Sequence, residues 1–379
     1  MRAGSGTLGA ERDEEVGMGK QLLVLIGTRK GAFILAGDPA GRGSSDSWRL
    51  SGPLCEGWPI NHFRHDPATG ALYAGGGSPW YGAAVWRSDD LGTSWTHSSQ
   101  GMTYGDEGPA MRAVWHVEPV GDVLYAGVEP AGLFKSIDGG ASWTHVEGLT
   151  NHPSRPSWQP GNGGLICHTV FAHPSDPDRM WVAISAVGCF ATEDGGASWE
   201  ARNRGVRVDG LPDPYPVTGQ CVHKMVAAAG QPERLYQQNH CGTYRSDDAG
   251  RNWVCLDEGL PSTFGFPIVA HPSDPDTVFT IPLNGDDRGR YVPEAKLAVW
   301  RTTDQGAHWS SLRQGLPGGD AFVGVLRESM ARDDLQPFGL YFGTSTGQLF
   351  ASADEGGSWR RMADLLPPIT SVETALVDA

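Results

Sequence analysis

Short runs in which hydrophobic and polar residues alternate recur along the whole chain, and turn-forming residues separate them. In one typical stretch, residues 165–202, the runs read LICHTVFAHP, RMWVAIS and GCFATEDGGASWEAR. Alternation with a period of two predicts β-strands, and no segment shows the period of an amphipathic helix. Four such strands within roughly 50 residues are typical of one blade of a β-propeller.

One motif, S/T-x-D-x-G-x-x-W, occurs six times. The copies end at Trp95, Trp143, Trp199, Trp253, Trp309 and Trp359. A spacing of 48 to 56 residues indicates a repeat architecture. In a hairpin between the third and fourth strands, the Asp accepts bonds from backbone N–H groups, the Gly takes a positive φ and the Trp packs against the neighbouring sheet. We therefore interpret the motif as architecture and give none of its residues a catalytic role.

The two ends of the chain together predict a seventh blade. The run LLVLIGTRKGAFILAG at residues 22–37, followed by DSWRLSG, supplies the second to fourth strands but lacks the innermost one. The run ITSVETALV at residues 369–377 can supply that strand, and its pairing would remove the exposed edges. We predict one all-β domain at residues 20–379, a seven-bladed β-propeller of four-stranded antiparallel blades. Its ring is closed by pairing of the N- and C-terminal strands.

The composition of the chain limits the partners and the compartment expected for this domain. Glycine makes up 53 of 379 residues, which suits a fold with many tight turns. The net charge of −15 argues against a nucleic-acid partner, and no apolar run reaches the roughly 20 residues of a membrane span. Six cysteines without paired spacing predict reduced thiols in the cytoplasm. The polar residues 1–19 predict a disordered tail without a secretory signal, and Met18 offers an alternative start. The sequence does not indicate an oligomeric state.

Six copies of the motif over nearly the whole chain resemble the Asp-box (BNR-repeat) propellers. This superfamily includes sialidases, xyloglucan-active glycoside hydrolases, sortilin-type receptors and photosystem II assembly factors. The resemblance implies the fold and leaves the function open. Sialidases carry an R-I-P motif, whereas the nearest string here is NHFRHDP at residues 61–67. The resemblance therefore implies a sialidase-like or glycosyl-hydrolase-like protein without the sialidase motif.

Long insertions predict that one face of the propeller carries the function. Loops from strand four to strand one and from strand two to strand three share a face, and long loops on a rigid scaffold commonly carry function. Trp80 and Tyr81 lie on such a loop and could stack on a substrate. Arg288 and Tyr291 belong to the string NGDDRGRY, which could grip a polar substrate, cap a pocket or form a solvated loop.

Two repeats align without a gap, and the alignment places His168 on His223. Both histidines come near the start of an innermost strand and are expected to point toward the central channel. Asn61 or His62 comes near the equivalent place in an earlier blade, and His116 falls slightly deeper in the next. Cys221, two residues before His223, is either a soft ligand or a small buried hydrophobe.

The exits of the second strands supply a further coincidence. Glu129 and His240 each come four residues after a tyrosine of such a strand. We predict that His168, His223 and His240 bind a transition metal, with Fe, Zn, Cu, Mn and Ni as candidates. Glu129, His62 and His116 would serve as acid–base groups. A pocket without metal and a merely solvated polar channel stay open.

Three functions fit these features. The first is an enzyme, metal-dependent or acid–base, acting on a small polar molecule. The second is a sialidase-like glycoside hydrolase acting on a carbohydrate, which needs two carboxylates at a defined separation. The third is a non-catalytic interaction scaffold. The histidine coincidence favours the first, because a scaffold gains nothing from titratable groups at its axis.

Overall fold

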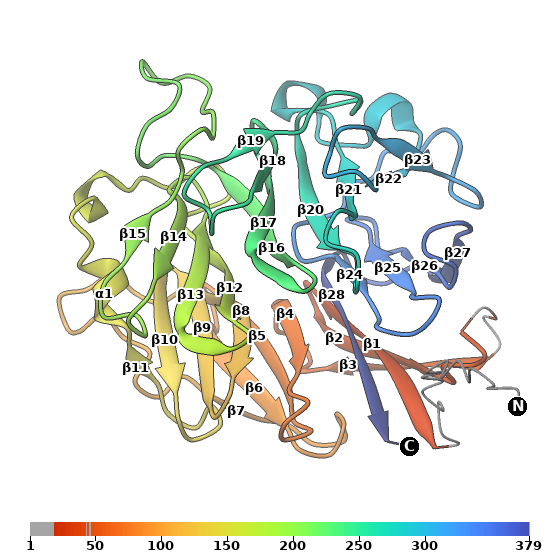
Figure 1. The fold of residues 1–379 in the computed structure, drawn as a ribbon. Coiled ribbons are helices and arrows are strands. Elements are labelled where there is room, and N and C mark those ends of the chain that lie inside the picture. Colours follow the sequence, from red (N-terminus) through yellow and green to blue (C-terminus); the bar gives the residue numbers. More distant parts are fainter. Residues whose placement is uncertain (1–18, 43, 45–46, 379) are drawn as a thin grey trace, which may run out of the picture.

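Seven four-stranded antiparallel sheets surround a central channel in the computed structural model (Figure 1). The structure describes residues 19–42, 44 and 47–378. The predicted seven-bladed all-β fold is confirmed. Apart from Gly19, the predicted tail lies outside the described residues. Among the described residues, no helix is long and apolar enough to cross a membrane.

Each sheet runs from an innermost strand at the channel to an outer strand. The innermost strands are β28 (Ile369–Asp378), β4 (Ile60–His65), β8 (Ala113–Val120), β12 (Cys167–His173), β16 (Val222–Ala228), β20 (Gly265–Ala270) and β24 (Met330–Arg332). The second strands are β1 (Lys20–Thr28), β5 (Leu72–Ser78), β9 (Val123–Glu129), β13 (Asp176–Ile184), β17 (Gln231–Asn239), β21 (Val278–Pro282) and β25 (Leu340–Gly343).

The outer half of six of the seven sheets ends in the repeated hairpin, and the sheet that contains β2 and β3 has no copy of the motif. The third strands are β2 (Gly31–Gly37), β6 (Gly82–Ser88), β10 (Gly132–Ser136), β14 (Gly188–Thr192), β18 (Gly242–Ser246), β22 (Val299–Thr302) and β26 (Leu349–Ser352). The outer strands are β3 (Trp48–Leu54), β7 (Thr96–Ser98), β11 (Thr144–His145), β15 (Glu200–Ala201), β19 (Val254–Cys255), β23 (Ser310–Leu312) and β27 (Arg360–Ala363). Loops carry the short helices α1 (Glu147–Thr150), η2 (Arg155–Ser157), η3 (Asp286–Arg288) and η4 (Pro293–Ala295).

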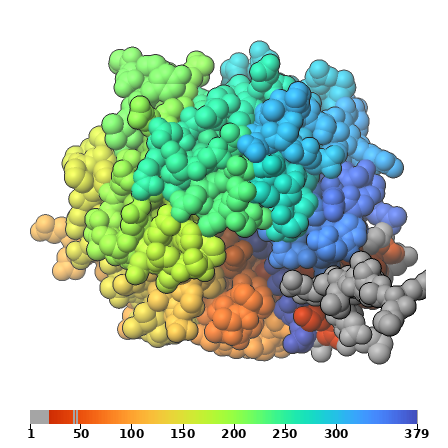
Figure 2. Space-filling model, in the orientation of Figure 1, coloured from red at the N-terminus to blue at the C-terminus, as the bar shows by residue number. Residues whose placement is uncertain are grey.

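The two ends of the chain close the ring. β28 pairs antiparallel with β1, from Lys20 opposite Asp378 to Thr28 opposite Ile369. The blue C-terminal strand accordingly lies beside the red N-terminal strands in Figure 1, and consecutive segments follow one another around the molecule in Figure 2. The predicted pairing of the chain ends is confirmed.

The motif has the structural role that its residues predict. In the second copy, the Asp138 carboxylate accepts bonds from the Ser142 backbone N–H at 2.9 Å and the Ser142 hydroxyl at 2.6 Å. The Ser136 hydroxyl donates to the same carboxylate at 2.7 Å. Gly140 has a φ of +90°, and Trp143 is buried. These contacts fix the hairpin that ends each of six blades.

Apolar cores lie between neighbouring sheets. In one of them, Ile184 and Phe190 of one blade pack with Leu133 and Leu149 of the preceding blade. Because the sheet faces are used for this packing, the inner strands present polar side chains mainly where they reach the channel. Function can therefore be sought along the axis and at its two mouths.

Candidate functional site

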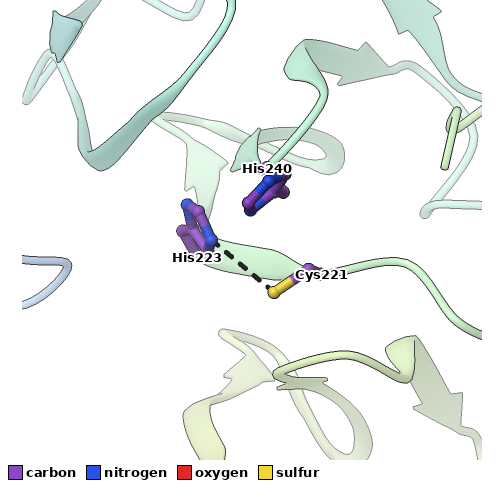
Figure 3. A group of neighbouring side chains, drawn as sticks. All are labelled: Cys221, His223 and His240. Carbon is purple, nitrogen blue, oxygen red and sulfur yellow. Dashed lines mark hydrogen bonds between the residues drawn. The ribbon is translucent and has the colours of Figure 1, made fainter. Parts of the chain in front are cut away.

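A cavity of about 210 Å³ opens at the upper mouth of the channel, defined as the end where β12, β16 and β20 begin. Cys221, His223 and His240 line it together with residues from several loops. The donor atoms of these three side chains all lie within 4.8 Å of one another. Figure 3 shows them around one small space. We call this group the upper triad.

Strand pairing creates the upper triad. Cys221 and His223 are two residues apart at the start of β16, so their side chains share one side of the strand. Val222 pairs with Asn239 of β17, and the His240 backbone N–H donates to the Cys221 carbonyl at 2.9 Å. The turn after β17 therefore brings His240 beside the other two.

The ring of His223 has a defined orientation. Its Nδ1 lies 2.6 Å from the Gly265 carbonyl oxygen, and its Nε2 lies 3.6 Å from the Cys221 sulfur. Because a carbonyl oxygen only accepts, Nδ1 carries the proton and Nε2 presents a lone pair to the cavity. Burial holds the pKa of His223 well below its ordinary value and raises the pKa of Cys221. His223 is therefore a neutral imidazole that lies beside the Cys221 thiol.

The structure does not bring His168 into the upper triad. Its Nε2 lies 2.8 Å from the Val222 carbonyl oxygen and its Nδ1 lies 3.0 Å from the Thr169 hydroxyl, so both ring nitrogens have protein partners. His168 is fully buried. Cys221, which the sequence left open as a soft ligand, takes the third place instead.

A shared structural role explains why His168 and His223 align. A register shift occurs at each histidine, and each bonds the first carbonyl of the next inner strand. Asn61 makes a similar contact in its blade, where its amide donates at 3.0 Å to the carbonyl of Val114, the second residue of β8. The repeated position is thus a contact between blades. His223 differs from His168 because it uses Nδ1 for this contact, and its Nε2 faces the Cys221 thiol in the cavity.

Glu129 lies at the edge of the upper pocket, outside the triad. Its carboxylate accepts a bond from the Trp115 indole N–H at 3.1 Å and pairs with Arg112 at 3.4 Å. A side chain at Gly164, which lines the pocket, would meet the Glu129 carboxylate at 2.9 Å. Glu129 is therefore fixed by its own partners beside the pocket wall.

The four predicted substrate residues lie away from the upper pocket, whose lining includes none of them. Trp80 is 93% exposed, and Tyr81 stacks on Trp58 at 4.8 Å between ring centroids. Arg288 is exposed, and Tyr291 packs edge-on against a phenylalanine. Their loop neighbours Asp286 and Arg290 line the pocket in their place.

His62 and His116 lie deeper, inside the channel. Their rings stack with centroids 4.1 Å apart, and both side chains are buried. Five charged side chains surround them, and we call all seven the axial cluster. Its members are Arg64, Glu118, Lys224, Glu328, Glu373, His62 and His116.

Ion pairs connect the axial cluster across four inner strands, β4, β8, β16 and β28, and the loop before β24. Arg64 bridges Glu118 at 3.1 Å and Glu373 at 3.3 Å. The Lys224 ammonium contacts the Glu328 carboxylate. A second cavity of about 420 Å³ opens below the cluster, toward the other mouth of the channel. The axial cluster therefore lies in the channel between the two cavities and is polar.

The axial cluster is a poorer metal site than the upper triad. The donor atoms of His62, His116 and Glu328 also lie within 4.8 Å of one another. However, His62 Nδ1 accepts a bond from the Val117 backbone N–H at 3.2 Å, so Nε2 carries the ring proton. That nitrogen then has no lone pair for a metal. The predicted acid–base residues His62 and His116 thus share a buried ion-pair network.

Acid is expected to destabilise the protein through His116. Burial and the neighbouring His62 lower the pKa of His116 to about 4, from an ordinary value of 6.5. The folded state therefore binds fewer protons, and the resulting stability, present above pH 6.5, is lost as the pH falls toward 4. Between pH 7 and pH 5 this histidine alone should cost about 2 kcal/mol.

Urea unfolding of the wild type and a His116→Gln variant at both pH values measures this contribution. The free energy of unfolding should fall more steeply with acid in the wild type. Equal slopes in the two proteins would contradict the assignment of a depressed pKa to His116.

Comparisons with known proteins define the fold. No protein-family model and no curated protein matches the chain. Among solved structures, the GH74 xyloglucanase from Xanthomonas campestris is 18% identical, with a TM-score of 0.55 over 93% of this chain and 52% of that chain. The GH74 enzyme from Niastella koreensis is 17% identical, with a TM-score of 0.57 over 94% and 55%. YCF48 from Cyanidioschyzon merolae is 16% identical, with a TM-score of 0.54 over 82% and 90%.

These similarities support the β-propeller and go no further, because identities this low are shared by proteins of different function. The chain spans about half the length of the two GH74 enzymes. An account of function therefore depends on the chemistry of the upper pocket.

Proposed function

We propose that the upper pocket is the metal site of an enzyme that acts on a small polar molecule. The observation that carries this proposal is the orientation of His223, whose Nδ1–H bonds the Gly265 carbonyl while Nε2 faces the Cys221 sulfur. Metal-binding histidines usually have their second ring nitrogen fixed in this way. One thiolate and two imidazoles suit Zn²⁺ best among the candidate metals, with Cu, Fe and Ni next and Mn least.

Three protein ligands leave room for a fourth, as in catalytic zinc sites. A bound ion of this kind would lower the pKa of a coordinated water and polarise a carbonyl or phosphoryl oxygen. Cys221 must lose its proton to act as a ligand, and burial raises its pKa. Metal binding should therefore release a proton and strengthen as the pH rises.

Glycoside hydrolysis is the second candidate, and the pocket chemistry fits it less well. Such enzymes need a carboxylic acid that stays protonated at working pH. A hydrogen bond from Arg290 holds the pKa of Asp286, a pocket carboxyl, below its ordinary value, so this group is a carboxylate. The similarity to GH74 enzymes concerns the fold alone.

We also propose that the chain is an Asp-box propeller and that it lies in the cytoplasm. Six hairpins with the same Asp and Gly geometry support the first placement. All six cysteines are free, which supports a reducing compartment.

Metal analysis of the purified, tag-free chain tests the proposed function. After loading with Zn²⁺ and removal of excess ion, we expect about one zinc per chain, the stoichiometry of a single site. Cys221→Ser and His223→Ala should each lose most of it. His308→Ser is the control, because His308 is 88% exposed and four of the other five motif copies have serine there.

Two results would contradict the proposed metal site. One is a wild type that retains no Zn, Fe, Cu, Mn or Ni after loading with each. The other is a Cys221→Ser or His223→Ala variant that folds and keeps the wild-type metal content.

A further inference from the structure

Arg327 is a positive charge in the upper pocket without a partner of opposite charge. It precedes β24 and lines the cavity beside the upper triad. Within the described part of the chain, its guanidinium makes no hydrogen bond and no ion pair. It lies over the rings of Trp115 and Phe266, at 5.7 and 5.8 Å from their centroids. The rings hold the side chain in place but leave its five N–H donors unused.

The other two arginines of the pocket are neutralised. Arg290 contacts both carboxylate oxygens of Asp286, with its Nη2 at 2.6 Å from one of them. Arg207 pairs with Asp209 at 2.7 Å. All four residues line the same cavity as Arg327. The pocket therefore has one positive charge in excess, although the whole chain carries −15.

Two carboxylates, Glu328 and Glu129, interact electrostatically with Arg327, but both already have other partners. Glu328 contacts Lys224, and Glu129 accepts a bond from Trp115 and pairs with Arg112. A partly buried charge without a counterion is costly, so the site would be stabilised by an anion from outside the chain.

We propose that the upper pocket selects molecules that carry an oxyanion, either a carboxylate or a phosphate, and that Arg327 binds this group. A guanidinium matches both oxyanions, because two of its parallel N–H groups can bond two oxygens at once. The inference rests on the proposed function, since it names the class of molecule that the same pocket takes. With the oxyanion on Arg327, the rest of a small molecule would lie against Cys221, His223 and His240.

Calorimetric titration of the full chain tests the inference. The probes are malonate for carboxylates, glycerol phosphate for phosphates and glycerol as a neutral control. At least one anionic probe should bind, and the probe that binds better identifies the oxyanion. Arg327→Gln should weaken that binding by roughly 10- to 100-fold, the effect of losing charge-assisted hydrogen bonds. Arg288→Gln should leave it unchanged, because it removes the same charge from an exposed residue outside the pocket.

The titrations are made on both zinc-loaded and metal-free protein, because an anion can also bind a metal directly. Binding that persists without metal and disappears in Arg327→Gln supports the inference even if the chain holds no metal. Normal zinc content with no anion binding overturns the inference and leaves the proposed function standing.

Variants that do not fold are replaced by Arg327→Lys. This change keeps the charge and loses the paired donors, so it should bind the anion with intermediate affinity. The inference is overturned if neither anion binds the wild type, or if folded Arg327→Gln binds as tightly as Arg288→Gln.

Discussion

A chain that ends at Pro368 is expected to lose its cooperative thermal transition, because it lacks β28. This strand is the innermost one of the closing blade and pairs with β1 along its length. Ile369 and Val372 are buried, and the Val372 backbone N–H donates to the Glu328 carbonyl at 2.7 Å. Truncation exposes the edge of β1 and opens the ring.

Circular dichroism and thermal unfolding measure this effect. A chain without residues 1–18, the polar segment that the sequence predicts to be a tail, serves as the control and should unfold like the wild type. A truncated chain with a wild-type melting curve would mean that the ring does not depend on pairing of the chain ends.

Removing one carboxylate from the axial cluster is expected to have the next largest effect. Glu328 is 2% exposed and holds the ammonium of Lys224, which is itself mostly buried. Glu328→Ala removes the one direct ion-pair partner that Lys224 has among the described residues. Breaking a buried pair in this way typically costs 3–5 kcal/mol, so we expect a loss of about 4 kcal/mol in the free energy of unfolding. A Glu328→Leu, Lys224→Met double variant should recover part of this loss, because it removes both charges.

Urea unfolding of the variants gives the comparison. Glu294→Ala is the matched control, since Glu294 pairs with Lys296 on the surface and is 72% exposed. Exposed pairs contribute roughly 0–1 kcal/mol. If Glu328→Ala lowers the free energy of unfolding no more than Glu294→Ala does, the axial cluster is solvated and does not stabilise the fold.

The repeated features of the chain made the fold predictable. Each Trp of the motif marks one hairpin, and the run at residues 369–377 was the only unassigned strand at the other end of the chain. These signals are local, because hairpin hydrogen bonds join residues close in sequence. The same counting brought His223 and His240 together, since strand pairing fixes their relation.

Features that differ between blades were not predictable in this way. His168 and His223 do occupy equivalent positions, but only the ring orientation shows which histidine turns a nitrogen toward the Cys221 thiol in the cavity. Arg327 and Glu328 lie in the loop between β23 and β24, whose sequence does not match the corresponding loops of the other blades. Closure of the ring brings both residues to the axis. No pattern in the sequence indicates that Arg327 faces a cavity without a carboxylate.

The proposed function depends above all on Cys221 and His223 binding one metal ion in the upper pocket. Its most direct test is the absorption spectrum of the Co²⁺-loaded chain, because cobalt substitutes for zinc and reports its ligands. We expect a thiolate-to-cobalt charge-transfer band in the wild type and its absence in Cys221→Ser. A cobalt-loaded wild type without that band, or a band that persists in Cys221→Ser, would contradict it.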